Sequence, residues 1–341
     1  MRAVGANTLL DVMGAVSALE FGVRRDGWGD DACALSAALQ TIAVRSKYPN
    51  GTLYLPPGTY NLESVIAGVS NVEIIGAGAA TVLRLNTGKN CNVLNLDGLS
   101  NVRISRLKIN GNRASNTSGN GLGIYINNCQ DCWFDAVEVV SCRQDAFQLN
   151  GSSRIHFHNC KTSDNGRHGF SLNTADFCEL GMVESYDNSQ VESAGTGDGI
   201  SLDTLSHDNV IIGAHAYETS LAGVRQGYGI REVSGGGCYR NLVIGGSFQG
   251  NKTGQVLLEP DSLWLAYNSL YTGGLGVNTA SPNASALLDL TSTRLGLLPP
   301  RLTTIQKNNI ASPATGLVVY DTTLNKLCVY TGAAWEAVTS A

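Results

Sequence analysis

Between residues 71 and 248 the sequence repeats one short pattern, a polar residue followed by an apolar-x-apolar triplet. The triplet recurs at intervals of 30, 30, 23, 23, 32 and 32 residues. Its first apolar position holds Val72, Val102, Cys132, Ile155, Cys178, Val210 and Leu242, and its second holds Ile74, Ile104, Phe134, Phe157, Leu180, Ile212 and Ile244. Repeats of roughly 20 to 50 residues stack on one another around a continuous core, so the pattern predicts a solenoid.

Within each repeat the apolar residues alternate with a period of two, which indicates strands rather than helices. The same alternation places Arg103, Trp133, His156 and Glu179 on the outer face of the first strand. Two further strands follow, with inward columns Leu107, Val137, Cys160 and Val183, and then Ile124/Ile126, Phe147/Leu149, Phe170/Leu172 and Ile200/Leu202. Three strands per turn predict an all-β parallel β-helix of about eight turns. A β-sandwich, the alternative for many short strands, does not explain the matched columns.

Composition excludes several functional classes. Charged residues make up 15% of the chain, and the net charge of -5 includes no basic cluster, so nucleic acid is not an expected partner. The sequence has no apolar run close to the ~18 residues that a membrane-spanning helix needs. Residues 1–10 lack the charged-then-apolar pattern of a signal peptide. We therefore expect neither membrane insertion nor signal-dependent export.

The nine cysteines raise the possibility of disulfides or a metal site, and Cys129 and Cys132 form a C-x-x-C motif. However, Cys132, Cys160 and Cys178 fall in inward strand positions where neighbouring repeats carry aliphatic residues. Cysteines there behave as small buried hydrophobic residues, and reduced thiols fit synthesis in a cytosol. We predict no metal site and no cofactor.

The segment before the repeats predicts a cap and carries a family resemblance. Ala32 to Arg45 has apolar residues at helical spacing behind Asp30 and Asp31, which indicates an amphipathic helix over the open first turn. The run from Phe21 to Asp31, followed by this helix and by Pro56-Pro-Gly-Thr-Tyr60, resembles the opening of the pectate-lyase-type β-helix family common in bacteriophage tailspikes. The resemblance implies a right-handed parallel β-helix, with residues 21–60 as capping helix and turn and residues 61–272 as β-helix.

The C-terminal part has a different character. Residues 273–285 are rich in Gly, Asn, Ser and Ala and are predicted to be a linker. Residues 286–341 resemble the short terminal module of phage tail fibres, on the evidence of Gly296 to Thr304, Pro313 to Tyr320 and the following run to Trp335. Two short strands are expected there, with too few residues for a strong core. The resemblance implies a homotrimer that recognises a receptor, located on the virion tail and made in the host cytoplasm.

Residues 1–20 are small and apolar without a repeat. In a tailspike this segment would attach the fibre to a tail, baseplate or adaptor protein, which would cover an otherwise exposed apolar patch. The alternative is a disordered or swapped terminus.

One corner column before the third strand contains titratable residues on successive turns. It holds Leu122, Asp145, His168, Asp198 and Tyr228. Inverting glycosidases place two carboxyl groups about 6.5 to 9.5 Å apart, and Asp145 and Asp198 stand two turns, about 10 Å, apart. We therefore predict Asp145 and Asp198 as catalytic acid and base, with His168 between them. Strict alternation would instead point the column inward, as a hydrogen-bonded ladder.

The same column resembles the site of polygalacturonase-type hydrolases, which carry an Asp-Asp pair on one turn and Gly-His-Gly on the next. Here only Asp145 of the pair is present, and Arg167 precedes His168. Predicted substrate-binding residues are Tyr125, Trp133, Gln148, Arg167, Tyr228 and Arg231. The function expected is a phage tailspike that binds and hydrolyses a bacterial surface polysaccharide. The alternatives are a polysaccharide lyase on the same fold and a non-catalytic receptor-binding or structural fibre.

Overall fold

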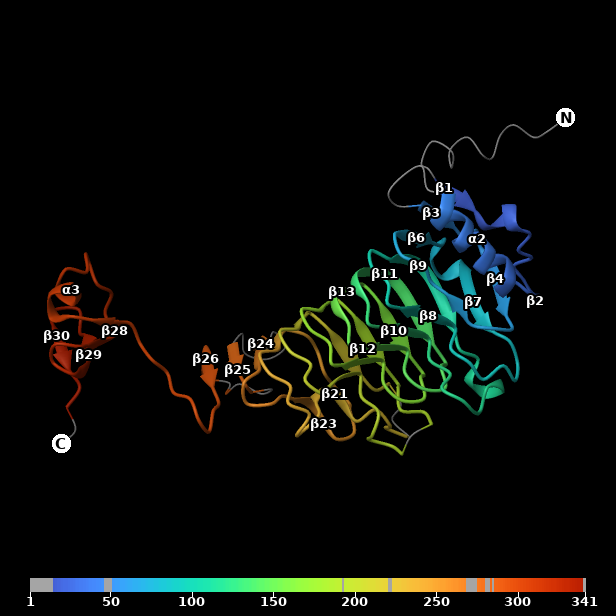
Figure 1. The fold of residues 1–341 in the computed structure, drawn as a ribbon. Coiled ribbons are helices and arrows are strands. Elements are labelled where there is room, and N and C mark those ends of the chain that lie inside the picture. Colours follow the sequence, from blue (N-terminus) through green and yellow to red (C-terminus); the bar gives the residue numbers. More distant parts are fainter. Residues whose placement is uncertain are drawn as a thin grey trace. The chain divides into compact units, whose positions relative to one another are not determined.

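The computed structural model of the protein describes residues 15–45, 51–191, 193–219, 223–267, 275–279, 283 and 285–339. The chain divides into a larger unit that ends at Asp289 and a smaller unit that begins at Leu290. The larger unit is a parallel β-helix, in which each coil of the chain stacks on the previous one (Figure 1). Among the described residues, no helix is long and apolar enough to cross a membrane.

Each coil contributes strands to three faces. The first face contains β3 (Gly51–Tyr54), β6 (Val72–Ile75), the first halves of β9 (Arg103–Asn110) and β11 (Gln130–Val140), β13 (Ser153–His158), β16 (Glu179–Gly181), β19 (Val210–Ile212), β22 (Leu242–Ile244) and β24 (Leu263–Tyr267). The second contains β4 (Gly58–Leu62), β7 (Thr81–Leu85), the second halves of β9 and β11, β14 (Lys161–Ser163), β17 (Glu184–Tyr186) and β20 (His215–Tyr217).

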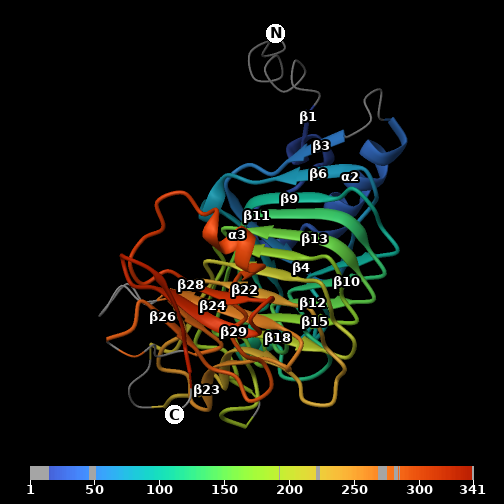
Figure 2. The ribbon, with the colours of Figure 1, turned by 90° about the vertical axis from the view of Figure 1, so that its left-hand side faces the viewer.

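The third face is a parallel sheet of eight strands. They are β5 (Ile66–Ala67), β8 (Leu94–Asp97), β10 (Ile124–Asn127), β12 (Phe147–Asn150), β15 (Phe170–Asn173), β18 (Ile200–Asp203), β21 (Tyr228–Glu232) and β23 (Gly254–Leu257). Figure 2 shows the strands of neighbouring coils lying side by side. The predicted β-helix with three strands per turn is thereby confirmed.

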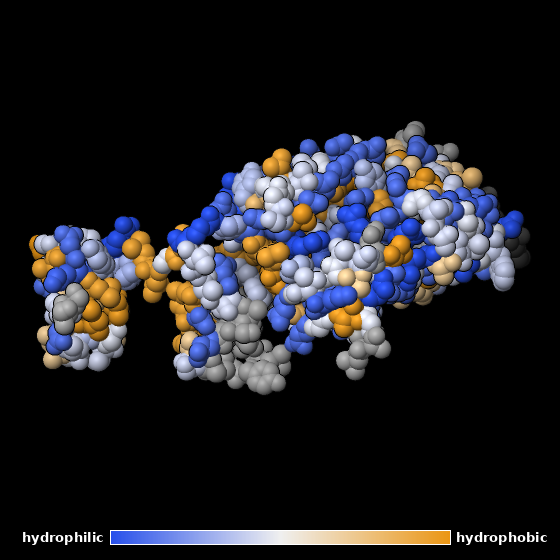
Figure 3. Space-filling view, turned by 90° about the horizontal axis from the view of Figure 1, so that it is seen from below, coloured by the Kyte–Doolittle hydropathy of each residue, from blue (hydrophilic) through white to orange (hydrophobic). Residues whose placement is uncertain are grey.

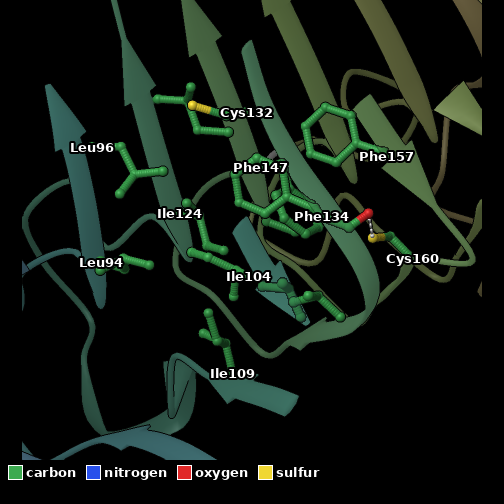
Figure 4. Packing of buried hydrophobic residues seen from close by; sticks show 14 of the residues in the cluster. Leu94, Leu96, Ile104, Ile109, Ile124, Cys132, Phe134, Phe147, Phe157 and Cys160 are labelled. Carbon is green, nitrogen blue, oxygen red and sulfur yellow. Dashed lines mark hydrogen bonds between the residues drawn. The ribbon is translucent and has the colours of Figure 1, made fainter. Parts of the chain in front are cut away.

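The interior is filled by the predicted inward columns. Phe134 stacks on Phe157, and Phe147 stacks on Phe170, each pair with ring centroids 5.0 Å apart. Figure 4 shows Phe134, Phe147 and Phe157 in the core. Edge-to-face contacts join the two stacks. The Cys160 thiol, fully buried among them, donates to the Phe134 carbonyl at 3.4 Å. All nine cysteines are free and Cys132, Cys160 and Cys178 are buried, as the sequence predicts.

The register of the last coils differs from the prediction. Glu179 pairs with Val210, and Leu180 pairs with Ile211, so the inward residues are Ile211 and Val243. The prediction that Val210, Ile212, Leu242 and Ile244 point inward is therefore wrong by one residue. The cause is the neighbouring inward position, which Asn209 and Asn241 occupy in place of an aliphatic residue. The Asn209 amide donates to Asn241 Oδ1 at 3.0 Å, so these buried polar groups satisfy each other.

The N-terminal end is covered as the sequence predicts. Helix α2 (Ala32–Arg45) buries Leu35, Leu39 and Ile42 in the same core as the first coils. Asp30 accepts from the Ala32 N–H at 2.9 Å, and Asp31 accepts from the Arg24 and Arg25 N–H groups. These acids therefore start the helix and fix the chain before it. The elements around α2 are β1 (Ala15–Ser17), η1 (Ala18–Phe21) and β2 (Asp26–Asp30).

The predicted virion-attachment segment covers residues 1–20, of which residues 1–14 lie outside the described residues. Its described part joins the first face, because β1 pairs in parallel with β3. Short 3-10 turns, η2 (Gly78–Ala80) and η3 (Arg113–Ser115), occupy two corners. At the other end β24 pairs antiparallel with β25 (Leu275–Val277), and β26 (Leu288–Leu290) follows.

The smaller unit is a four-stranded sheet with one short helix. It comprises β27 (Arg301–Leu302), α3 (Thr304–Asn308), β28 (Val318–Asp321), β29 (Lys326–Tyr330) and β30 (Trp335–Ala337). The two strands expected from the sequence correspond to β28 and β29. Its interior is small: Val319 and Cys328 are buried beside an ion pair of 2.8 Å between Lys307 and Asp321.

Candidate functional site

The corner column with Asp145, His168 and Asp198 is a buried ladder. Asp145 Oδ1 accepts from the His168 N–H at 2.9 Å, and His168 Nδ1 accepts from the Asp198 N–H at 2.9 Å. Asp198 Oδ1 in turn accepts from the Tyr228 N–H at 2.8 Å. Each side chain thus satisfies the backbone of the next coil. Both aspartates are 0% exposed and His168 is 5% exposed.

Electrostatics in this ladder follow from its burial. Burial holds the pKa of His168 well below its usual value, with further lowering from Arg167 and Arg231, so the imidazole is neutral and Nδ1 is free to accept. Burial also raises the pKa of Asp198 to about 6, against the opposing effect of Arg231, whose guanidinium lies 2.7 Å from Asp198 Oδ2. Arg167 lies 3.3 Å from Asp145 in the same way.

The catalytic role of this column stays a prediction. Asp145 and Asp198 both face inward, as the alternative of a hydrogen-bonded ladder requires, and neither carboxylate is exposed to a polymer outside. General acid and base catalysis requires a carboxyl within hydrogen-bond reach of the substrate. The geometry therefore favours a structural role for the ladder.

The predicted substrate-binding residues fall on two separate faces. Tyr125, Gln148 and Arg231 belong to one outward column of the third face, where Ser171 and Ser201 stand between Gln148 and Arg231. Tyr228 and Arg167 lie at the corner beside that face, and the Arg231 guanidinium lies 5.8 Å from the Tyr228 ring centroid. All of them are partly exposed. Trp133 lies apart from them, on the outer side of the first face.

A surface depression surrounds Trp133, and we call it the Trp133 groove. Its volume is about 480 Å³, and its polar lining includes Glu73, Arg103, Ser105, Trp133, Asp135, His156, His158 and Glu179. These residues come from successive coils at β6, β9, β11, β13 and β16. Because the strands are in register, outward side chains of the same column stand directly over one another. The sequence pattern alone places them on one face.

The side chains in the Trp133 groove form an ordered stack. The Arg103 guanidinium lies 4.8 Å from the Trp133 ring centroid on one side, and the His156 ring stacks on the other at 5.5 Å with an interplanar angle of 6°. Cation–π and stacking contacts of this kind hold long side chains in one arrangement. The rings therefore present their edges outward from a rigid row.

Glu179 closes the row. His158 Nε2 lies 3.2 Å from Glu179 Oε1, and His156 Nδ1 lies 3.4 Å from Oε2. The hydrogen bond from His158 holds the pKa of Glu179 below its usual value, and His156 adds to this effect. A carboxylate that stays ionised and remains partly exposed is suited to act as a base or to bind a hydroxyl.

Sequence reasoning placed Trp133 among the binding residues but assigned no role to Arg103, His156 or Glu179. The signal was present, because all four were expected on the outer face of the first strand in consecutive repeats. Asp135 and His158, two residues further along the strands, were missed altogether.

Comparison with known proteins identifies two regions of the chain. Residues 15–204, more than half of the chain, match the rhamnogalacturonase A/epimerase, pectate lyase-like family. The chain belongs to this family. Residues 276–341 match the phage tail like trimerisation region. The resemblances to the pectate-lyase-type β-helix family and to the terminal module of phage tail fibres are thus confirmed. No curated protein matches the chain.

Solved structures with similar folds include two phage proteins. ORF18 of Geobacillus virus E2 is 14% identical over 99% of this chain and 90% of its own, with a TM-score of 0.52. The pre-mature gene product 12 of bacteriophage phi29 is 17% identical over 81% of this chain, which spans 36% of the phi29 chain, with a TM-score of 0.55. At these identities the likeness establishes the fold alone.

Proposed function

We propose that this protein is a homotrimeric phage tail protein that binds a bacterial surface polysaccharide in the Trp133 groove and hydrolyses it. The observation that carries the proposal is the groove itself, in which a rigid aromatic row, two imidazoles, a guanidinium and three carboxylates share one depression on the outside of the β-helix. The pectate-lyase-like family and the trimerisation match provide the setting, with the protein acting outside the host cell on the virion tail.

The terminal region supports the trimer. Large aliphatic side chains are left in solvent there, with exposures of 81% for Leu287, 75% for Leu295, 71% for Leu297 and 66% for Leu298. A segment with so small a core and so many exposed leucines gains stability from contact with other chains. Residues 276–341, which contain these leucines, are the part that matches the trimerisation region.

The chemistry of the Trp133 groove suits a sugar polymer. Sugars offer hydroxyls and, in acidic polysaccharides, carboxylates. Imidazole, carboxylate and guanidinium groups bind these in bidentate or charge-assisted hydrogen bonds. The groove follows the direction in which the coils stack, so a chain of sugars can contact several coils at once. Recognition would therefore use Arg103, Trp133 and His156.

Hydrolysis requires two carboxyl groups. Glu179, kept ionised by His158, is assigned as the general base. Asp135 lies two coils away on the same face and is assigned as the acid. Two coils separate the strands by about 10 Å, and Asp135 lies two residues, about 7 Å, further along its strand than the residue aligned with Glu179. Their Cα atoms are therefore about 12 Å apart, and side chains that extend toward each other bring the carboxyl groups within the about 6.5 to 9.5 Å that inverting enzymes use.

The test is release of reducing ends from host surface polysaccharide by the purified protein. Glu179→Gln and Asp135→Asn are each expected to reduce release by at least about a hundredfold, since general acid and base catalysis contributes that much. Glu184→Gln is the matched control, because Glu184 is an outward glutamate in the same coil on the second face, with a similar exposure. Release by this control is expected to be unchanged.

Other outcomes would redirect the proposal. Loss of release in a folded Asp198→Asn variant, with Glu179→Gln still active, would move the chemistry to the buried ladder. Unsaturated ends among the products would indicate a lyase. Binding that Trp133→Ala abolishes, without any product from the wild type, would leave a receptor-binding fibre.

A further inference from the structure

The last coils of the first face carry an outward apolar surface. Strands β19, β22 and β24 align Val210 with Leu242 and Leu263, and Ile212 with Ile244 and Leu265. All six side chains point away from the core, which is filled instead by Ile211, Val243 and Trp264. We call the outward six residues the apolar stripe: Val210, Ile212, Leu242, Ile244, Leu263 and Leu265.

We propose that the apolar stripe packs against the same stripe of two other copies of this chain and extends the trimer contact along the β-helix. The proposal rests on the homotrimer of the proposed function. It names a second contact surface, separate in sequence from the region that matches the trimerisation model.

The exposure of the side chains in the apolar stripe indicates that this surface binds a partner. Ile244 and Leu263 are 36% and 37% exposed, and the other four are half-buried. At the corner beside them Met182 is 62% exposed. Isolated exposed aliphatic residues are ordinary, but a contiguous grid of them on a flat strand surface is typical of an interface. Figure 3 shows the molecule from below, where apolar side chains are scattered among polar ones.

The position in the chain identifies the partner as another copy. Strand β24, the last of the stripe, ends at Tyr267, and the trimerisation match begins at residue 276. A contact that joins three chains from residue 276 onward therefore begins eleven residues after Leu265, the last residue of the stripe. The linked surfaces then meet at a high effective concentration, so that a modest apolar contact is sufficient to hold them.

The chemistry of the stripe excludes a sugar as its natural occupant. Its six side chains are aliphatic and offer neither a hydrogen-bond donor nor an acceptor, whereas a polysaccharide needs both. Because none of the six is charged, identical stripes meet without like-charge repulsion, and burying them removes apolar area from water. The same six residues are therefore suited to self-association.

The test measures assembly of the full chain by sedimentation over a dilution series. A Leu242→Asp and Leu263→Asp double variant is expected to dissociate at a concentration at least about tenfold higher than the wild type, because each buried charge in an apolar contact costs more than about 1.4 kcal/mol. Leu257→Asp is the matched control: this leucine is 41% exposed on the third face and lies outside the stripe. It is expected to assemble like the wild type.

Different failures are distinguishable. A wild type that sediments as a monomer would remove the trimer itself. A trimeric wild type whose double variant dissociates no sooner than the Leu257→Asp control would overturn the stripe contact and leave the trimer. Should the acidic variant lose the circular dichroism of the β-helix, the milder Leu242→Gln and Leu263→Gln pair replaces it, with the same shift in dissociation expected.

Discussion

The early and the late coils of the first face have the same backbone but opposite side-chain patterns. In the early coils Cys132, Ile155 and Cys178 point inward, and Trp133, His156 and Glu179 point outward. In the late coils Asn209, Asn241 and Ser262 take the inward position, and Val210, Leu242 and Leu263 take the outward one. One sheet thus has a polar outer surface at one end and an apolar outer surface at the other.

The difference teaches that inward and outward do not mean apolar and polar in a stacked β-helix. Each inward side chain lies next to the backbone and side chain of the following coil, so polar groups satisfy one another from coil to coil: Cys178 N–H donates to Asn209, and Asn209 donates to Asn241. Asn241 and Ser262 also donate to the buried Glu232 carboxylate, each at 2.7 Å. Polar residues can therefore fill the interior, and the outer position is free to serve binding.

The largest effect is expected from truncating an inward side chain of β19, in comparison with an outward one. Ile211→Ala removes a fully buried side chain and should reduce the free energy of unfolding by about 3 kcal/mol. Ile212→Ala, on the outward side, should cost about 1 kcal/mol or less. Denaturant midpoints of both variants at one chain concentration provide the measurement. A larger loss for Ile212→Ala than for Ile211→Ala would indicate that Ile212 points inward, as the sequence pattern predicts.

A smaller effect is expected from breaking the inner amide ladder. Asn241→Leu leaves the Asn209 amide and the Glu232 carboxylate short of partners, which should cost about 2 kcal/mol. Cys178→Ala, at the matching position two coils earlier, removes a sulfur and leaves no polar group unsatisfied, so about 1 kcal/mol is expected. Equal or reversed losses in thermal or denaturant unfolding would contradict the ladder's role.

The smallest effect is a difference in pH dependence between Glu232 and Glu179. Burial raises the pKa of Glu232, so the folded chain holds its proton more tightly than the unfolded chain, and stability falls as the pH rises from the ordinary glutamate value through the raised one. The hydrogen bond from His158 lowers the pKa of Glu179, so its contribution is complete above the ordinary value and is lost as the pH falls through the lowered one.

Unfolding midpoints between roughly pH 3 and 7 measure this difference. Glu232→Gln should make the variant relatively more stable toward neutral pH than the wild type, and Glu179→Gln should make it relatively more stable toward acid, each by less than about 1 kcal/mol. Parallel pH profiles for the two variants would show that the environments of Glu232 and Glu179 do not differ in this way.

The fold was predictable because the repeat is visible in the chain. The intervals of 30 and 23 residues put Val102, Cys132 and Ile155 in one column, and the structure confirms that column. The predicted helix agrees with α2, and the two strands expected in the terminal module agree with β28 and β29. The prediction was wrong in the late coils. Asn209 interrupts the apolar pattern there, so the pattern predicts the next aliphatic residue, Val210, as the inward one.

The site was predictable only in part. Alternation correctly placed Trp133, His156 and Glu179 on the outside, and the corner column of Asp145, His168 and Asp198 is a real column. Sequence does not reveal whether a corner residue turns into the core or out of it, because that depends on the backbone angles at the corner. It also does not show that outward side chains leave a depression between them, since this depends on how large neighbours pack.

The sequence by itself determined the solenoid, the cap and the division into β-helix and terminal module. Periodicity and turn residues are local properties, and the same pattern recurs in every repeat. Only the tertiary structure decided which residues face each other across coils. It decided that Asp198 is buried beneath the corner, and that Leu242 is outside while Val243 is inside. These are consequences of register, and in a strand a shift of one residue reverses every side chain.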